Sequence, residues 1–420
     1  MPRILFVSII NSVGSERAVA AMGRLGAECA VLSPVGSYSS LTRFAARHFV
    51  LPPYRGVRRL GLLTARRRLE IALLDFRPDT VVPLDDLSAK FLCGIALDPS
   101  TREPVRAALV EALGSPQGFA VACDRRRGMD LAVRLGLRTP GHCTATDAVV
   151  ARDVAAAWGY PVVLKREHSG GGDGVAIAWD SMQLGAAFET LQVRGKHWKG
   201  WVTRTSRRFL WRWAGLPFSP DAPPLLQRHI NGTPAMHTLA AFQGRVLEAV
   251  SFLAERTHPG PTGPSTMVRH IENPEMADTA ARLVAALGCS GLLSFDFVLE
   301  GGKTNAYLIE INPRPIAVAS LGPLFGHNVY GALVAQLRGW PAPPKSSEPD
   351  TRPVALFPQE LVRDPQSLRM RLDKGEVIHD LPCDDWGVVA AYERYLVQMH
   401  RTHAELVRQL LRSVGRRRDQ

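Results

Sequence analysis

The sequence predicts a mixed α/β fold, because strand-like and helix-like segments alternate at its start and a long hairpin lies near residue 300. Residues 3–10 have the apolar character of a buried strand, 15–25 that of a helix and 28–32 that of a second strand. Residues 294–315 alternate apolar and polar side chains around a Gly-Gly turn, which predicts two antiparallel strands. With 420 residues, the chain is long enough for two to four domains.

A second α/β unit follows the first. It consists of a helix near 64–75 and an apolar strand over 77–83, after which come Asp85 and Asp86. Carboxylates just beyond the C-terminal end of a parallel strand lie where α/β sheets bind ligands. They are equally suited to cap the helix that begins near Leu87. Both interpretations remain open at this stage.

Three consecutive arginines begin the next helix, after Asp124. The helix dipole disfavours cations at this end, so their presence suggests that an anion binds nearby. Taken alone, however, such a run usually means a solvated face of the helix.

A lysine and a glycine-rich loop form a second group that favours anion binding. Residues 162–165 read as a strand that ends at an inward Lys165, and the chain resumes as a strand over 175–178. Glycines let backbone N–H groups approach an anion closely. A flexible hairpin loop is the simpler alternative. The candidate loop residues are Ser169, Gly170, Gly171, Gly172 and Gly174.

The predicted hairpin carries acidic and amide side chains where apolar ones are expected. Glu310 and Asn312 are two residues apart and therefore project from one face of their strand, and Asp296 is expected opposite Glu310. Two carboxylates and an amide oxygen make a site suited to Mg2+ (or Mn2+). Arg314 follows on the turn after Pro313.

These motifs together resemble the ATP-grasp superfamily. Asp-Phe at 296–297 followed by Glu-Ile-Asn-Pro-Arg at 310–314 is similar to its metal-binding end, and the basic residue with the glycine loop is similar to its phosphate grip. The run Asp-Arg-Arg-Arg at 124–127 is similar to the ATP-binding half of carbamoyl-phosphate synthase large subunits, where an arginine serves the ATP phosphates. This resemblance makes Arg125 our first choice for that role, with Arg126 as the alternative.

The resemblance covers roughly residues 1–340 and implies a domain order. We expect a Rossmann-like pre-ATP-grasp domain over 1–113 and an ATP-grasp domain over 114–340, with a lid at about 140–228 and a metal-bearing part over 229–340. A Pro- and Ser-rich linker over 341–353 and a mostly helical, basic extension over 354–420 follow.

The resemblance also implies residue roles. The segment Gln227, Arg228, His229 and Ile230 corresponds to the hinge whose backbone meets adenine, although Arg228 stands where many members have an acid. Arg256 and Arg269 are expected near the acceptor, where each could hold a carboxylate. Arg314 is expected beside the transferred phosphoryl group.

Residues 190–224 are an expected insertion in the lid, with four of the chain's eight tryptophans and seven arginines or lysines. A basic helical hairpin that packs its tryptophans into the lid is the simplest interpretation. Contact with single-stranded bases, an anionic membrane or a polyanionic acceptor are the alternatives. The whole chain has a formal net charge of +12, and much of the excess is local to this segment and the C-terminus.

Composition excludes several classes of protein. With 46% hydrophobic residues the chain is not disordered, and its six scattered cysteines lack metal-ligand spacing, which favours a cytoplasmic location. No apolar run reaches the roughly 18 residues that span a bilayer. An apolar stripe of helical period runs from Tyr392 to Val414, and we expect it to serve packing or homodimer formation, with membrane association as the minor alternative.

The function expected from the resemblance is that of an ATP-dependent carboxylate–amine ligase, with ATP and Mg2+ and with small-molecule carboxylate and amine substrates. Two alternatives remain open. One is activation of bicarbonate, as in carbamoyl-phosphate synthase, and the other is a nucleotide-binding regulatory protein that acts through residues 190–224. Nucleic-acid binding is the least favoured, because no recognised module accompanies the basic segment.

Overall fold

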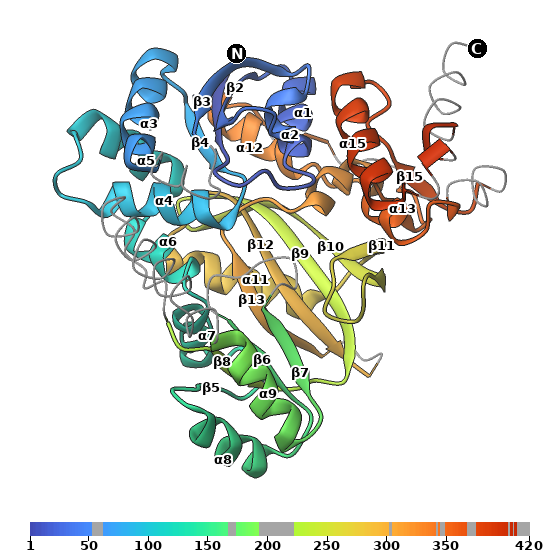
Figure 1. Cartoon of the computed structure of the whole chain (residues 1–420). Helices are drawn as coiled ribbons and strands as arrows, with labels where there is room; N and C mark the ends of the chain where they lie inside the picture. Colours follow the sequence, from blue (N-terminus) through green and yellow to red (C-terminus); the bar gives the residue numbers. More distant parts are fainter. Residues whose placement is uncertain are drawn as a thin grey trace.

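The computed structural model describes residues 1–52, 62–166, 174–192, 222–301, 305–341, 343–344, 349–367, 375–401, 404–405 and 407–409. Within these residues the chain forms three sheets stacked along one long axis (Figure 1). The N-terminal sheet and the C-terminal elements lie at one end, the largest sheet lies in the middle, and a small sheet lies at the other end. Among the described residues, no helix has the length and apolar character needed to cross a membrane.

The N-terminal sheet is parallel, with strand order β3-β2-β1-β4, as the alternating pattern predicts. Its elements are β1 (Arg3–Val7), α1 (Glu16–Arg24), β2 (Glu28–Pro34), α2 (Tyr38–Leu41), β3 (Ala45–Leu51), α3 (Leu62–Phe76), β4 (Thr80–Pro83), α4 (Asp86–Leu97) and α5 (Glu103–Leu113). The first strand ends at Val7 and not at Ile10, because the backbone N–H groups of Ile9 and Ile10 donate to the Asp85 carboxylate.

The small sheet has the order β5-β8-β6-β7 and forms the lid-like end of the molecule. This part comprises α6 (Pro116–Ala122), α7 (Arg125–Arg134), β5 (His142–Thr144), α8 (Ala148–Trp158), β6 (Val162–Lys165), β7 (Val175–Ala178), α9 (Ser181–Gln192) and β8 (Leu225–Arg228). It has a core of its own, built from residues such as Leu164, Leu184 and Leu226. Most of the predicted insertion, 193–221, lies outside the described residues.

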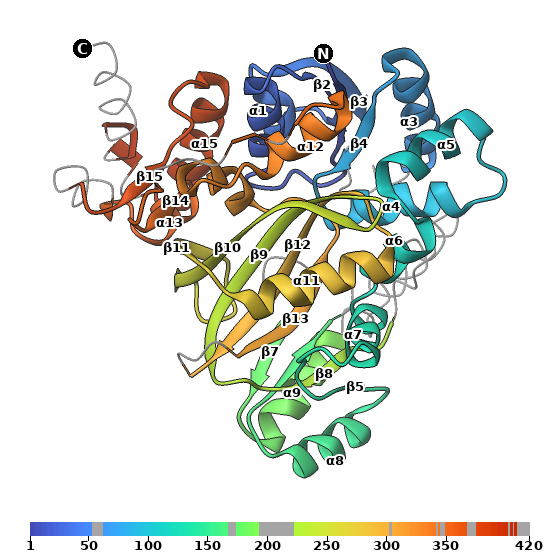
Figure 2. The ribbon, with the colours of Figure 1, turned by 180° about the vertical axis from the view of Figure 1, so that it is seen from behind.

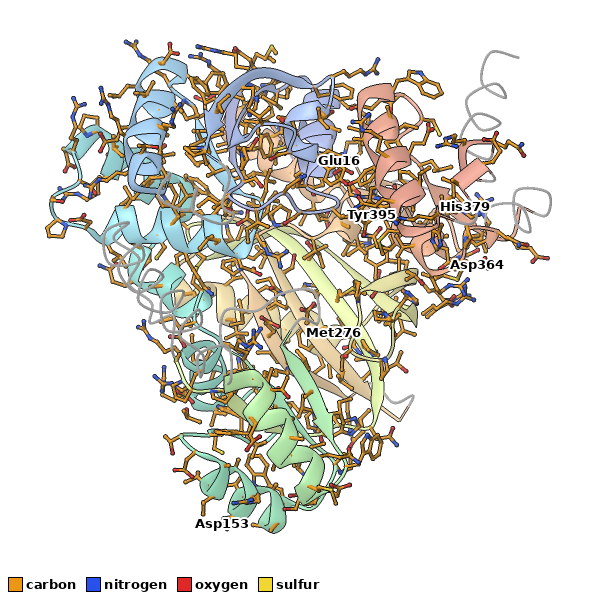
Figure 3. The ribbon with its side chains drawn as sticks, viewed as in Figure 1. Glu16, Asp153, Met276, Asp364, His379 and Tyr395 are labelled. Carbon is orange, nitrogen blue, oxygen red and sulfur yellow. The ribbon has the colours of Figure 1, made fainter. Side chains whose placement is uncertain are left out.

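The central sheet has seven strands in the order β13-β12-β9-β10-β11-β14-β15. Its part of the chain contains β9 (Gly232–Phe242), β10 (Arg245–Thr257), β11 (Ser265–Ile271), α11 (Pro274–Leu287), β12 (Gly291–Glu300), β13 (Ala306–Asn312), the 3-10 helix η2 (Ala317–Phe325) and α12 (Val329–Arg338). Figure 2 shows α11 lying across one face of the sheet, where Met276, labelled in Figure 3, is fully buried. Phe295 and Phe297 belong to the same core.

The opposite face of the central sheet packs against the N-terminal domain. Phe252 and Leu292 share a core with Ile4 and Phe6 of β1, and with Phe325 of η2. This packing places the start of β12 and the end of β13 next to the start of α4, and it therefore brings residues about 200 positions apart into one place.

The region after residue 354 contains two short strands beside the expected helices. It contains β14 (Val354–Leu356), α13 (Gln359–Arg363), β15 (Ile378–Asp380) and α15 (Trp386–Met399). β14 pairs with β11, and β15 pairs with β14, so this region completes the central sheet. The residues of β14, Val354, Ala355 and Leu356, are buried. By pairing with β11, they cover a strand that would otherwise be an unpaired edge of the sheet.

Part of the predicted apolar stripe near the C-terminus packs within the chain. Tyr392 and Leu396 of α15 are fully buried in a cluster with Phe357. The ring of Tyr392 stacks on Tyr38, and its hydroxyl donates to the carboxylate of Glu16 at 2.8 Å. Figure 3 labels Glu16 and Tyr395 at this boundary between α1 and α15.

Candidate active site

The hairpin of β12 and β13 presents the predicted carboxylates side by side. Asp296 pairs with Glu310, and Ser294 pairs with Asn312, in an antiparallel register. Directly opposite residues point to the same face of a sheet, so Asp296, Glu310 and Asn312 share one face. The amide nitrogen of Asn312 donates to Oδ2 of Asp296 at 2.9 Å. The geometric prediction for these three residues is confirmed.

Asp296 is in an environment that disfavours its negative charge. Its pKa is raised to about 6, first by burial and then by the neighbouring Glu310 carboxylate, against the opposing effects of Asn312, Arg314 and Lys165. Two half-buried carboxylates that lie close together are stabilised by a bound cation. A donor set made only of carboxylate and amide oxygens fits Mg2+.

Arg125 joins this hairpin to the start of α7. Its Nη2 donates to Oε1 of Glu310 at 2.6 Å, and its Nη1 donates to the carbonyl of Arg166 beyond the end of β6. Asp124 caps the helix by accepting from the backbone N–H of Arg127, and this cap aims the side chain of the first helical residue inward. Arg126 is exposed and pairs with Asp130 at 3.1 Å, so the structure favours Arg125.

Lys165 lies buried at the end of β6, as predicted. The pKa of its ammonium is lowered to about 8, first by burial and in addition by Arg125, against the opposing effects of the Glu310 and Asp296 carboxylates. Lys165 therefore interacts electrostatically with both acidic residues of the hairpin. The lid lysine and the hairpin, 145 positions apart at Lys165 and Glu310, face the same space.

The glycine loop is described only at its end. Gly174 has a φ of +89°, a backbone conformation that favours glycine, and its carbonyl accepts from the N–H of Arg166 at 2.8 Å. Ser169, Gly170, Gly171 and Gly172 lie outside the described residues.

Arg314 reaches from the hairpin to the N-terminal domain. Its Nε donates to Oδ1 of Asp86 at 2.6 Å, and its Nη2 donates to Oδ2 at 3.3 Å. Burial alone would raise the pKa of Asp86, but Arg314 outweighs it, with help from Lys90 and Arg125, and the pKa lies below its usual value. Asp86 was not among the predicted site residues. The signal for it was its position after β4, at the strand end where α/β sheets bind ligands.

Asp85 has the structural role that the sequence left open. It caps α4 by accepting from the N–H of Ser88, whose side chain reciprocates, and its carboxylate also holds the N–H groups of Ile9 and Ile10. The two neighbouring aspartates therefore divide their roles: Asp85 caps the helix, and Asp86 holds Arg314.

A pocket opens between the hairpin and the N-terminal domain. Its lining combines the start of α4, the α6–α7 turn and the end of β13 and consists of Asp86, Ala89, Lys90, Ala122, Cys123, Arg125, Glu310, Ile311, Asn312 and Pro313. Three of the predicted site residues thus line one pocket together with Asp86 and Lys90.

The predicted hinge lies on β8, at the centre of the small sheet. Gln227 is almost fully buried, and its amide nitrogen has no hydrogen-bond partner within the described part of the chain. Arg228 is exposed, its N–H donates to the carbonyl of Gly141, and His229 lies 6.1 Å from the ring of Trp179. Contact of Gln227, Arg228, His229 and Ile230 with adenine stays a prediction.

The prediction for Arg269 needs correction. Arg269 pairs with Leu253, which pairs with Ala235 and then with Phe297, so its side chain leaves the sheet on the face opposite to Asp296. There its guanidinium bonds to Glu255 and to the carbonyl of Thr351. Sequence alone could not give this face, because it depends on the register of four strands.

Arg256 also has a partner within the chain. Its Nη1 donates to Oε1 of Glu360 on α13 at 2.7 Å. A role for Arg256 in holding the acceptor stays a prediction.

Part of this chain is similar in sequence to known proteins. Residues 209–318 match the family model of the ATP-grasp domain. The chain is 27% identical over 209 residues to the carbamoyl phosphate synthase large chain of Pseudomonas syringae pv. tomato. This match covers 48% of this chain and only 17% of that relative.

Solved structures are similar in fold over most of the chain. One is the biotin carboxylase domain of the Hydrogenobacter thermophilus 2-oxoglutarate carboxylase, in complex with MgADP, ADP and bicarbonate. It has a TM-score of 0.58 and 16% identity, with 84% of this chain and 72% of that chain covered. Another is the L-amino acid ligase of Bacillus licheniformis, with a TM-score of 0.54, 15% identity and coverage of 80% and 74%.

The matched segment contains Gln227 of the hinge strand and the whole acidic hairpin, and the fold similarity covers up to 84% of the chain. The predicted ATP-grasp fold, with a parallel N-terminal sheet before it, is therefore confirmed. The chain thus carries a segment that matches the ATP-grasp domain, within a fold similar to those of a biotin carboxylase and an L-amino acid ligase.

Proposed function

We propose that the protein is an ATP-dependent carboxylate–amine ligase that forms a carbon–nitrogen bond with release of ADP and phosphate. The observation that carries this proposal is the convergence of Lys165 and Arg125 with Asp296, Glu310 and Asn312 in one place. The cations suit the phosphates of a nucleotide, and the oxygens suit the metal that accompanies them.

The reaction needs activation because hydroxide is a poor leaving group. A carboxylate oxygen attacks the γ-phosphorus of ATP, and the bond to the bridging oxygen of ADP breaks. An amine then attacks the carbonyl carbon of the acyl phosphate, phosphate leaves with the bonding electrons, and the amine loses a proton. Both steps depend on positioning and on stabilisation of charge, and neither needs a covalent nucleophile from the protein.

The residues of this chain have distinct proposed roles. Asp296, Glu310 and Asn312 would hold Mg2+, which supplies a positive charge next to the phosphate oxygens when it is bound. Lys165 and Arg125 neutralise and orient the phosphates, and Arg125 also fixes the carboxylate of Glu310. Arg314, held by Asp86, stabilises charge on the transferred group.

The fold relatives support this class of reaction. One neighbour is an L-amino acid ligase, and another was solved with MgADP and bicarbonate. The second observation, together with the carbamoyl phosphate synthase relatives, favours a second candidate, in which bicarbonate is the carboxylate that is activated.

The test is a screen of ADP and phosphate release across a matrix of small carboxylates and amines, with MgATP. Release that needs both a carboxylate and an amine supports the ligase. Release that needs bicarbonate without any other carboxylate supports the second candidate. Lys165→Ala and Glu310→Ala should each lower turnover by roughly 100-fold or more. Unchanged turnover in both variants would refute the assignment of the site.

A further inference from the structure

Two histidines and a glutamate meet at the edge of the central sheet, and we propose that they form a binding site for a divalent transition-metal ion, with Zn2+ as the best fit. His270 lies near the end of β11, Glu272 follows that strand, and His327 lies between η2 and α12. Each offers one ligand atom, and the three atoms lie within 4.8 Å of one another. The proposal is independent of the ligase assignment.

The separations match a coordination shell. Oε1 of Glu272 lies 3.6 Å from Nε2 of His270 and 3.5 Å from Nε2 of His327. Ligands bound to Zn2+ at about 2.0–2.1 Å in a tetrahedral arrangement stand about 3.3 Å apart, so these two edges need to shorten by only a few tenths of an ångström. Two imidazoles and one carboxylate favour Zn2+ over Mg2+, which prefers oxygen ligands.

A second carboxylate orients one of the histidines. Nδ1 of His327 lies 3.0 Å from Oε1 of Glu248 on β10, and the same oxygen accepts from the backbone N–H of Ala249. An ionised carboxylate can only accept, so Nδ1 of His327 carries the proton, and the lone pair of Nε2 is directed at the cluster. Metal-binding histidines have this arrangement, in which a carboxylate holds the nitrogen that does not bind the metal.

Aromatic rings hold the other histidine. His270 stacks on Phe325 of η2, with ring centroids 4.9 Å apart and planes 13° from parallel, and it meets Phe252 in an edge-to-face arrangement with centroids 6.0 Å apart. The rings of His270 and His327 are 5.5 Å apart. Two ligands are therefore preorganised, whereas the side chain of Glu272 is 78% exposed and leaves an entry path and an open coordination position.

This cluster is separate from the candidate active site. Strands β9 and β10 lie between β11, which carries His270, and β12, which carries Asp296. At the usual spacing of strands, three steps across the sheet amount to about 14 Å. A metal ion here would tie the connection between η2 and α12 to β11, and thereby fasten a segment that follows the catalytic hairpin to the central sheet.

The experiment measures Zn2+ binding to the full chain after removal of metals with a chelator. Millimolar MgCl2 keeps oxygen-only sites occupied, and a chromophoric chelator competes for Zn2+. We expect one Zn2+ per chain, a higher melting temperature with Zn2+, and a Co2+ complex with the visible spectrum of tetrahedral coordination. Glu272→Gln and His327→Gln should weaken Zn2+ binding at least tenfold, and Glu248→Gln by about 10- to 100-fold.

A matched control and an independent variant keep the result interpretable. His48→Gln replaces an exposed histidine on β3 and should leave Zn2+ binding unchanged. Glu272 is exposed, so Glu272→Gln remains decisive even if circular dichroism shows that His327→Gln fails to fold. Affinity and stoichiometry unaltered by Glu272→Gln and His327→Gln would overturn the proposal, and so would the lack of any binding tighter than millimolar.

Discussion

Arg314 holds Asp86 across 228 positions of sequence, through two hydrogen bonds of 2.6 and 3.3 Å. Arg314 follows the acidic hairpin of the ATP-grasp domain, and Asp86 is the first residue of α4 in the N-terminal domain. This pair makes the N-terminal domain part of the site, because it fixes the cation next to Asp296 and Glu310. It also gives Asp86 a testable role.

Replacing Asp86 by Asn should lower kcat by about 10- to 100-fold, because Arg314 loses its charged partner and the position that depends on it. The KM for ATP should change much less, since Lys165 and Arg125 remain. Steady-state kinetics of ADP release check this expectation. Asp79→Asn serves as the control, because this aspartate holds Arg3 at the far end of the same β-α unit. Equal loss in both variants would contradict a positioning role for Asp86.

Arg125 and its neighbour Arg126 form a matched pair of tests. Arg125→Ala should weaken nucleotide binding and lower turnover by roughly 100-fold, because it removes a buried cation that contacts Glu310. Arg126→Ala removes an exposed pair with Asp130 and should change turnover by less than about twofold. Isothermal titration with ADP and a turnover assay measure both effects. A larger loss of turnover in Arg126→Ala than in Arg125→Ala would contradict the assignment of Arg125 as the phosphate-contacting arginine.

Two glycines in helices should respond oppositely to alanine. A Cβ on Gly118 of α6 would lie 1.7 Å from the carbonyl oxygen of Leu287, so Gly118→Ala must push α6 away from α11. We expect a loss of about 2–4 kcal/mol in the free energy of unfolding. Gly185 of α9 has no atom within 4 Å of its Cβ position, and Gly185→Ala should stabilise by about 0.5–1 kcal/mol.

Chemical denaturation with two probes measures the glycine variants, because the lid and the central sheet have separate cores. A destabilisation of similar size by both substitutions would contradict the packing argument for Gly118 and the helix-propensity argument for Gly185.

The buried His237 should make the stability of the protein depend on pH. Its ring is buried against Ser251, and burial lowers its pKa from 6.5 to about 4, with a further contribution from His327. Between these values the unfolded chain binds a proton that the folded protein excludes, so stability falls as pH is lowered from about 6.5 to 4. At about 1.4 kcal/mol per pKa unit, this histidine lowers the free energy of unfolding by up to about 3 kcal/mol over this pH range.

Denaturation midpoints measured between pH 4 and 8, in a metal-free buffer, test this effect. His237→Gln should flatten the dependence, even though it lowers stability at neutral pH. His48→Gln, at an exposed position, should leave the slope unchanged. The same slope in all three proteins would contradict the assignment to His237.

Much of the site could be predicted because its residues interrupt clear local patterns. Asp296, Glu310 and Asn312 occupy strand positions next to buried apolar ones, and the hairpin register then follows from alternation. Lys165 was recognisable as a cation at the end of an apolar strand beside glycines. The parallel N-terminal sheet follows in the same way from alternating strands and helices.

The tertiary structure alone decided which distant groups meet. Asp86 and Asp85 are indistinguishable in the sequence, and only the packing of α4 against the hairpin gives one of them Arg314 and the other the helix cap. The side chain of Arg269 lies on the face of the sheet opposite to Asp296, because the pairing of β11, β10, β9 and β12 fixes its direction. β14 and β15 are strands because an edge of the central sheet was there to pair with. Local patterns determine which face of its own strand a side chain occupies. Contacts between distant segments depend instead on how whole sheets pack, and a short stretch of sequence carries no information about that packing.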